Sequence, residues 1–391
     1  MTQPTNVPSR PHLEFLDGLR GCAAIYVACS HIVGESTVGT TGVEGFIFHW
    51  LLYGRIAVAM FIVLSGYCLM LPVVSGGGDS IPGGNIAYFK RRARRILPPY
   101  YAALAFTFLI SVVSTTGLHM LAGQAGNGQR ATALRDMLSA GDIVSHLMLI
   151  HNWSPHFNML FDGPTWSVAS EWQIYFLFPF LLLPARRCFG RYGPIVIGFG
   201  LGIGMCFLPY RYSLYWACPW YIGLFALGML GAQITFGTGE AEIRLRDKAS
   251  WGVLAVLSWA VTAGLWMWDG KVLINRFGYL LDGVAGFASL STILYCAHVR
   301  QSSGARGSGV LNVLQSKPAV TLGAFSYSLY LLHQPFSLKL GPLMMHIPHP
   351  FRIPFLVFVG MPTIVGCCWV FYLIFERPFT RSKASNRSTG R

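Results

Sequence analysis

The first apolar segment of the sequence, LEFLDGLRGCAAIYVACSHIV, carries side chains that could do chemistry. Arg20 lies near its start, and His31 follows by 11 residues, roughly 16 Å along a helix axis. Inside a membrane each ionisable group costs about 2.5 to 3.5 kcal/mol and needs a reason. His31 could act as a general base, Arg20 could bind an anion, and Asp17 is a candidate substrate-binding residue. Alternatively, Asp17 and Arg20 pair at i and i+3, and His31 marks the outer interface.

A second polar segment, GPTWSVASEWQIYFLFP, opens another apolar helix. By the expected topology its carboxylate, Glu171, lies in the outer half of the membrane, at a depth comparable with His31. A neighbouring carboxylate could hold the tautomer of His31 and stabilise its protonated form, so we predict the two as the catalytic pair. Trp166, Gln173 and Tyr175 are candidate substrate-binding residues. A hydrogen bond between helices that serves only packing is the alternative.

A basic cluster, KRRARRILPPYY, marks the expected start of the third helix. Such clusters ordinarily anchor a helix at anionic headgroups. Arg92 and Arg95 lie one turn apart, however, and together with Arg20 they could hold phosphates through charge-assisted hydrogen bonds. Ser65, in FIVLSGYCL, is a further candidate for this binding site, although Ser65 and Gly66 equally suit close helix packing.

A histidine near the C-terminus is a further candidate. The motif GAFSYSLYLLHQPF places His333 at the outer end of a helix, where we consider it a substrate-binding residue. A simple interfacial role is the alternative. Asp282 and His298 receive no role from the sequence.

The composition places these residues in a helical membrane protein. The chain has 391 residues, of which 53% are hydrophobic and 11% charged. Apolar stretches of about 18 residues recur, long enough to cross a hydrocarbon core about 30 Å thick. In lipid such stretches must be helices, because unpaired backbone amides cost several kcal/mol each, and the alternating pattern of a β-barrel is absent. The predicted fold class is therefore all-α, a polytopic helical bundle.

The cysteines and the excess of basic residues have ordinary explanations. The nine cysteines form no C-x-x-C pair and mostly lie in apolar runs, so buried side chains are favoured over disulfides and no metal cofactor is expected. The 29 Lys and Arg residues exceed the 15 acids, but they cluster between apolar segments. This pattern is a topology signal, and nucleic acid is not an expected partner.

About ten transmembrane helices are predicted, with a short apolar segment, 142–152, that is re-entrant or interfacial. Loops on the N-terminal side carry most of the Lys and Arg, so both termini are expected in the cytoplasm, in a bacterial inner membrane. The first span is expected to be retained, since no cleavage site precedes it. Residues 1–379 form the predicted membrane domain, and 380–391 a disordered tail. The predicted spans are 15–33, 51–73, 96–116, 165–184, 193–209, 217–236, 250–268, 277–297, 318–338 and 354–375.

Several of these motifs, in this order and over nearly the whole chain, resemble the acyltransferase 3 family of membrane acyltransferases. The family's Arg-x10-His pair falls on Arg20 and His31, and its Arg-x-x-Arg on Arg92 and Arg95. Tyr67 stands where the family more often has Phe. The Ser-Gly-aromatic and Trp-Ser…Glu-x-Gln-x-Tyr motifs fall on Ser65, Gly66, Tyr67, Trp166, Ser167, Glu171, Gln173 and Tyr175.

The resemblance implies transfer of an acyl group, usually acetyl, from coenzyme A to a hydroxyl that is often on a sugar. We expect acyl-CoA, above all acetyl-CoA, at the cytoplasmic arginines 20, 92 and 95. An extended pantetheine arm could bridge the distance from Arg20 to His31. The expected acceptor is an envelope glycan or a macrolide-type metabolite. The hydrolase-like domain attached to some family members is absent from this sequence, so this domain or a separate partner is expected to complete the transfer.

We expect direct transfer with His31 as the base, although an acyl-His or acyl-Ser route stays open. The sequence contains no G-x-S-x-G motif to support a serine nucleophile. A transporter of a sugar or acyl donor is the alternative from another class, but the inverted repeats and broken helices typical of transporters are not apparent. Membrane lipid surrounds the protein in this interpretation, and a homo-oligomer is compatible with it.

Overall fold

The computed structural model describes residues 13–36, 48–77, 80–122, 139–154, 163–208, 211–303 and 309–380. Within these ranges every regular element is a helix, so the predicted all-α class is confirmed. The predicted tail lies outside the described residues, apart from Thr380, which ends the last helix.

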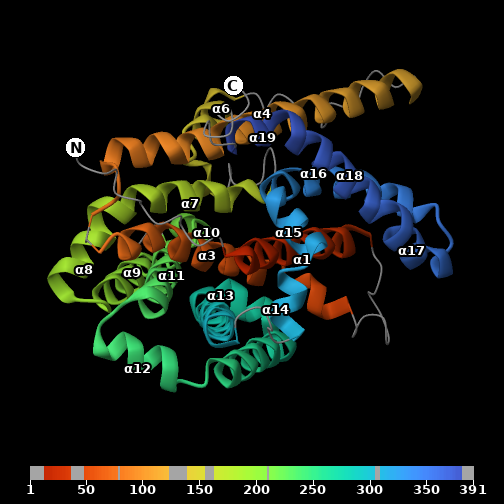
Figure 1. The fold of residues 1–391 in the computed structure, drawn as a ribbon. Coiled ribbons are helices and arrows are strands. Elements are labelled where there is room, and N and C mark those ends of the chain that lie inside the picture. The colour runs from red at the N-terminus through yellow and green to blue at the C-terminus, as the bar shows by residue number, and fades with distance from the viewer. Residues whose placement is uncertain are drawn as a thin grey trace, which may run out of the picture.

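Long helices build the bundle (Figure 1). Some predicted spans continue through one or more labelled pieces, because short π-helical turns interrupt them. The main helices are α1 (Glu14–Ser36), α3 (Arg55–Ser75), α4 (Gly84–Ala122), α7 (Thr165–Leu177), η3 (Phe178–Leu182), α8 (Leu183–Phe189), α9 (Gly193–Met205), α11 (Tyr221–Phe236), α13 (Trp251–Ser303), α15 (Lys317–Ala324), α16 (Ser326–Met345), α17 (His349–Phe355), η4 (Leu356–Gly360), α18 (Met361–Phe371), η5 (Tyr372–Glu376) and α19 (Arg377–Thr380). The short helices are η1 (Trp50–Leu52), α6 (Ala140–Leu147), η2 (His151–Trp153), α10 (Arg211–Trp216), α12 (Glu240–Lys248) and α14 (Gly309–Leu314).

The outer surface has the character of a membrane protein. Large apolar side chains such as Phe180, Val196, Phe358 and Ile374 point outward and are exposed. Six helical segments of the described residues are long and apolar enough to cross a membrane. These support an integral membrane protein, whereas the count of about ten spans stays a prediction. The six segments are Arg55–Ser75, Thr165–Phe189, Leu214–Phe236, Trp251–Gly270, Val272–Ser302 and His349–Thr380.

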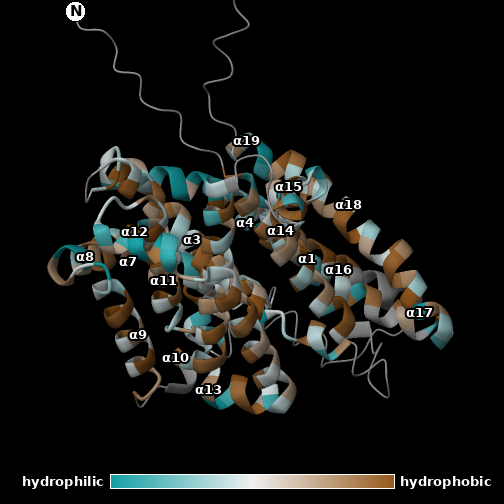
Figure 2. Ribbon diagram, turned by 60° about the horizontal axis from the view of Figure 1, so that its bottom comes forward, coloured by the Kyte–Doolittle hydropathy of each residue, from teal (hydrophilic) through white to brown (hydrophobic). Residues whose placement is uncertain are grey.

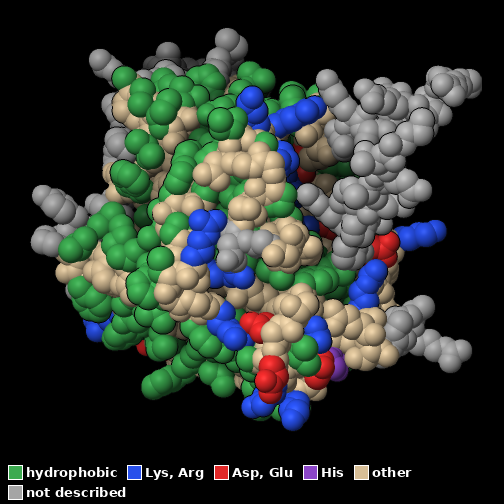
Figure 3. All heavy atoms as spheres, turned by 60° about the vertical axis from the view of Figure 1, so that its left-hand side comes forward, with side chains coloured by type: hydrophobic (Ala, Val, Ile, Leu, Met, Phe, Trp, Pro, Cys, Tyr) green, Lys and Arg blue, Asp and Glu red, His purple; other side chains and the backbone are tan. Residues whose placement is uncertain are grey.

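Polar and basic side chains collect at one side of the bundle. Figure 2 shows that α12 and the beginning of α4 are hydrophilic, whereas α9 and α18 are largely hydrophobic. The space-filling view of this side shows Lys and Arg side chains gathered among a few acids (Figure 3). Arg191, which precedes α9, pairs with Glu242 of α12 at 2.7 Å. This basic side is the one that the sequence assigns to the cytoplasm.

The third predicted helix begins earlier than the sequence indicated. The expected span was 96–116, with the basic cluster at its start, but α4 begins at Gly84. The arginine cluster therefore lies within a 39-residue helix, and Pro98 and Pro99 are inside it. The sequence did not indicate the first 12 residues of α4, because the expected spans were placed on apolar stretches and these residues include the basic cluster. As a result, Arg92 and Arg95 have fixed helical positions.

The segment 142–152 is too short to span, as predicted from its length. It forms α6 and η2, in which His146 and His151 are buried with their rings stacked 4.1 Å apart. Burial lowers the pKa of His151 to about 3, and repulsion by His146 acts in the same direction. The His151 ring is therefore neutral at neutral pH, so the stacked pair does not hold two positive charges.

The core of the bundle is organised around α1 and α3. α11 and α13 pack against α3, and α15 and α16 pack against α1. Gly66 of α3 faces the carbonyl of Phe225, and Gly228 of α11 faces the carbonyl of Val63. A Cβ atom on either glycine would overlap that carbonyl, so the two backbones approach closely only because both residues lack side chains. The predicted packing role of Gly66 is therefore seen in the structure.

Candidate active site

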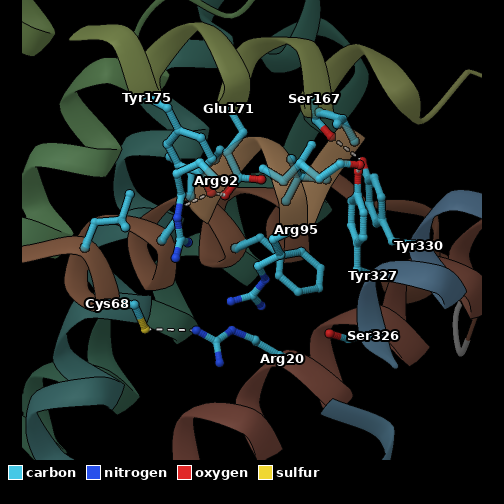
Figure 4. A pocket seen from close by; sticks show the side chains of 17 residues that line it. Arg20, Cys68, Arg92, Arg95, Ser167, Glu171, Tyr175, Ser326, Tyr327 and Tyr330 are labelled. Carbon is cyan, nitrogen blue, oxygen red and sulfur yellow. Dashed lines mark hydrogen bonds between the residues drawn. The ribbon is translucent and has the colours of Figure 1, made fainter. Parts of the chain in front are cut away.

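Five helices surround a partly enclosed pocket with ≈ 820 Å³ of space including its mouth (Figure 4). On α3, α7 and α16 the lining residues recur every three or four positions, which places them on one face of each helix. The lining residues are Arg20 of α1, Val58, Phe61, Ile62, Ser65, Cys68 and Leu69 of α3, Arg92, Arg95 and Ile96 of α4, Ser167, Val168, Glu171 and Tyr175 of α7, and Ser326, Tyr327 and Tyr330 of α16.

Three predicted anion-binding residues meet in this pocket. The guanidinium groups of Arg20, Arg92 and Arg95 point into the same space from two helices (Figure 4). Among the described residues, no carboxylate lies within ion-pair distance of Arg92 or Arg95. Arg92 is half-buried and Arg95 is exposed to the pocket. An anionic ligand that entered here would meet cations that are not already neutralised.

Arg20 is held in place by its neighbours. Its Nη1 donates to the Oδ1 of Asp17 at 2.5 Å, and its Nη2 contacts the Sγ of Cys68 at 2.9 Å. This is the i, i+3 pair that the sequence offered as the alternative for these two residues. Asp17 does not line the pocket, so the structure places it behind Arg20, apart from its predicted contact with substrate.

Glu171 lies among the arginines and does not pair with His31. Its Oε1 accepts a hydrogen bond from Tyr175 at 2.5 Å, and the Tyr175 hydroxyl lies 3.0 Å from the Oγ of Ser65. The expected Glu171–His31 pair is therefore not formed. Glu171 lines the same pocket as Arg20, whereas His31 does not, so the depths expected from chain position did not bring Glu171 and His31 together.

His31 instead lies beside His333. Their ring centroids are 5.0 Å apart, with the planes inclined at 52°. His333 is completely buried, and His31 is half-buried. Neither histidine lines the arginine pocket. The structure thus gives His31 a second imidazole as its neighbour in place of the predicted carboxylate.

Tyr330 separates the arginine pocket from the two histidines. It lines the pocket, and its ring lies 5.8 Å from the ring of His333. The Tyr330 hydroxyl donates to the carbonyl of Pro164 at 3.0 Å and lies 2.5 Å from the Oγ of Ser167. The pocket therefore extends from the arginines to a tyrosine that contacts His333, the ring neighbour of His31.

Gln173 and Trp166, two predicted substrate-binding residues, lie outside this pocket. Gln173 is two residues beyond Glu171, about 200° around the helix, and therefore points away. Its Nε2 donates to the carbonyl of Leu149 and the Oδ1 of Asn152, each at 2.8 Å, so it fixes the segment 139–154 to α7. Trp166 lies under the guanidinium of Arg55, whose carbon is 5.9 Å from the ring centroid.

Asp282, which the sequence left without a role, is the centre of a buried polar cluster. It is fully buried and accepts hydrogen bonds from Arg55 at 2.5 Å, Tyr53 at 2.7 Å and Trp220 at 2.9 Å. The Arg55–Asp282 ion pair joins α3 to α13 over a sequence separation of 227 residues. Because Arg55 also covers Trp166, this cluster fixes the beginning of α7 beside the site.

The structure adds Cys68, Ser326, Tyr327 and Tyr330 to the site residues. The signal for three of them was present, since Ser326, Tyr327 and Tyr330 recur at helical spacing before His333. Tyr327 donates to the carbonyl of Ile96 on α4 at 3.2 Å. No group of three His, Cys, Asp or Glu side chains that could hold a metal occurs in the part of the chain that the structure describes.

Comparison with known proteins gives the family. The chain is 24% identical over 343 residues to the acyltransferase MdmB of Streptomyces mycarofaciens, covering 83% of this chain and 79% of that protein. It is 26% identical over 340 residues to the O-acetyltransferase OatA of Staphylococcus aureus, covering 83% of this chain but 50% of OatA. No solved structure matches the chain. A family model described as an acyltransferase domain matches residues 13–373, so this chain belongs to the acyltransferase 3 family and is an acyltransferase enzyme.

Proposed function

We propose that this protein is a membrane O-acyltransferase that moves an acyl group from cytoplasmic acyl-CoA to a hydroxyl of a sugar-containing acceptor. Acetyl-CoA is the proposed donor, and an envelope glycan or a macrolide-type metabolite is the proposed acceptor. The convergence of three arginines on one pocket carries this proposal. The pocket lies between the ends of α1 and α4 that the charge pattern assigns to the cytoplasm.

The arginine pocket suits the nucleotide end of coenzyme A. Coenzyme A carries several phosphate groups, and a guanidinium binds a phosphate through paired, charge-assisted hydrogen bonds. Arg92 and Arg95 are free of carboxylate partners among the described residues, so their charge is available to the ligand. Glu171 and Tyr175, which are hydrogen-bonded to each other, form one wall of the pocket, where they would contact the donor.

The opposite end of the pocket suits the thioester. Phe61, Ile62 and Val58 provide an apolar passage from the arginines toward Tyr330. A pantetheine arm that extends along it brings the acyl carbon to Tyr330, beside the histidine pair. For that carbon to reach His31, the Tyr330 ring must turn away from Ser167 and Pro164.

His31 is the proposed general base. It takes the proton of the acceptor hydroxyl as the oxygen attacks the thioester carbonyl. The new C–O bond forms, the C–S bond breaks, and the proton passes from His31 to the departing thiolate of coenzyme A. The acceptor proton therefore ends on the thiol of coenzyme A, and His31 returns to its neutral form for the next turnover.

The acceptor class rests on the relatives. OatA is named an O-acetyltransferase, and the similarity to this chain covers half of its length. Oxygen is thus the proposed atom that receives the acyl group.

The test is acetyl transfer by purified protein in lipid nanodiscs. [14C]Acetyl-CoA is supplied with either glycan strands prepared from peptidoglycan or a macrolide, and labelled ester is measured. We expect ester formation by the wild type and at least a 100-fold loss in His31→Ala, because general-base catalysis contributes about 10²- to 10⁴-fold. His298→Ala is the matched control, since His298 lies at the end of α13 outside the site. Full activity of His31→Ala would exclude His31 as the base.

A further inference from the structure

His31 has the ring of His333 as its neighbour, where a carboxylate was expected. The two centroids lie 5.0 Å apart with the ring planes inclined at 52°, and the rings are not hydrogen-bonded to each other in this structure. His31 is on α1 and His333 is on α16, two helices that pack directly against each other. A rigid helix interface therefore sets the distance between the imidazoles.

The hydrogen bonds of His333 define which of its nitrogens carries hydrogen. Its Nδ1 lies 3.1 Å from the carbonyl oxygen of Leu329, one turn earlier on α16. A carbonyl can only accept a hydrogen bond, so Nδ1 carries the hydrogen and Nε2 of the neutral ring is an acceptor. This Nε2 is buried and has no hydrogen-bond partner among the described residues. An unsatisfied buried acceptor beside a proposed base requires an explanation.

We propose that His333 is a positioning residue for His31: after a rotation of the tilted His31 ring, the Nε2 of His333 accepts a hydrogen bond from a ring N–H of His31. This inference rests on the proposed function and adds a residue to it. The bond fixes the tautomer of His31, so its other nitrogen lacks hydrogen and faces the acceptor hydroxyl. When His31 takes the acceptor proton it carries two N–H groups, and His333 continues to accept from one of them. The proton that His31 took from the acceptor then passes to the thiolate of coenzyme A, and the protonation of His333 does not change.

The position of Tyr330 agrees with this arrangement. It lies one turn before His333 on α16, and its ring is 5.8 Å from that of His333. Movement of the Tyr330 ring would open the pocket without moving His333, whose Nδ1 is attached to the backbone of its own helix. The histidine pair thus stays assembled when the thioester arrives.

The test compares three substitutions at one position in the acetyl transfer assay. His333→Phe and His333→Leu fill the site without an acceptor, whereas the side-chain oxygen of His333→Gln can still accept from His31. We expect kcat to fall about 10- to 100-fold in the Phe and Leu variants, with KM for acetyl-CoA within about twofold of wild type. We expect His333→Gln to recover most of kcat. Calorimetric binding of coenzyme A, which we attribute to arginines that His333 does not contact, should be unchanged in all three and reports that each is folded.

Several results would overturn this role. One is a wild-type kcat in His333→Phe or His333→Leu, and another is a change in these variants that affects only KM. A third is a kcat of His333→Gln that is no higher than that of His333→Phe. If the Phe and Leu variants fail to bind coenzyme A, the Gln variant still decides, because an inactive, folded Gln variant contradicts the proposal. A wild-type protein that forms no acetyl ester would contradict the proposed function itself, and this role with it.

Discussion

Arg92 and Arg95 illustrate how residues of a topology signal can also line a pocket. The same cluster contains Arg94, which is exposed and does not line the pocket. A basic cluster that served only to anchor the helix would use all of its arginines alike. Instead, Arg92 and Arg95 lie on the face of α4 that lines the pocket with Arg20, whereas Arg94 lies on another face of the same helix.

We predict that Arg92→Ala weakens binding of acetyl-CoA about 10- to 100-fold, because a charge-assisted hydrogen bond contributes about 1.5 to 3 kcal/mol. Arg94→Ala removes the same charge from the same helix without touching the pocket, and it should bind as wild type does. Isothermal titration in nanodiscs measures both. Equal weakening in the two variants would mean that general charge, rather than the pocket, attracts the donor.

The Arg55–Asp282 pair makes a different prediction, about stability. Asp282 is fully buried, so removal of Arg55 alone leaves a buried carboxylate with only Tyr53 and Trp220 as donors. We expect Arg55→Met to destabilise the protein by about 3 to 5 kcal/mol. The double variant Arg55→Met, Asp282→Leu should be less destabilised than Arg55→Met, because no buried charge remains. Thermal unfolding in detergent compares them, and a double variant worse than the single one would refute this explanation.

The contacts that the sequence indicated and the structure contains are mostly between residues close in sequence, although Arg20 meets the distant Arg92 and Arg95 in one pocket. Arg92 and Arg95 are one turn apart, and the Arg20 pair with Asp17 is local. The contacts of Glu171 and Asp282 depend on how distant helices pack, and sequence spacing contains no such information. Glu171 was therefore assigned to the wrong partner, and Asp282 was assigned to none.

At the scale of helices, the contact between α3 and α11 determines the shape of the site. Ser65 faces the pocket, and the next residue, Gly66, lies against the backbone of α11. One helix thus presents the pocket wall on one side and a close backbone contact on the other. A change at Gly66 would move Ser65 as well as α11.

We predict that Gly66→Ala lowers the melting temperature and reduces activity, because its Cβ would overlap the carbonyl of Phe225. Gly264→Ala is the control, since a Cβ there meets open space in α13. The control should be neutral or slightly stabilising, because alanine favours a helix over glycine by about 1 kcal/mol. Fluorescence-detected thermal stability separates the two variants. A Gly66→Ala protein as stable as the control would show that α3 and α11 can move apart freely.

Helix type was predictable and helix boundaries were less so. The long apolar runs fixed where α3 and α11 lie, because only a helix satisfies backbone groups in lipid. The start of α4 was misplaced by 12 residues, from 96 to 84, because its first turns are basic. Two predicted spans, 250–268 and 277–297, correspond to parts of α13, whose backbone is non-helical at Asp269 and Phe277.

At the scale of the whole molecule, the proposal that the donor binds from the cytoplasm depends on the orientation of the basic side. Cys188, near the end of α8, is exposed on this side and provides a natural probe of topology. We predict that a membrane-impermeant maleimide labels Cys188 only after cells are broken. An added cysteine, Ser154→Cys, lies after η2 and should be labelled in intact spheroplasts. Peptide mass spectrometry locates the labels. Labelling of Cys188 in intact spheroplasts would reverse the orientation and place the arginine pocket outside.

In the proposed function, one pocket holds the phosphates of the donor at the arginines and directs its thiol end to the histidine pair. A cryo-electron microscopy structure of the wild-type protein with coenzyme A in nanodiscs would show this arrangement most directly. We predict phosphate density at Arg20, Arg92 and Arg95 and a pantetheine arm that ends near Tyr330, with its sulfur toward His31. Coenzyme A bound elsewhere, or an arm that points away from His31, would contradict it.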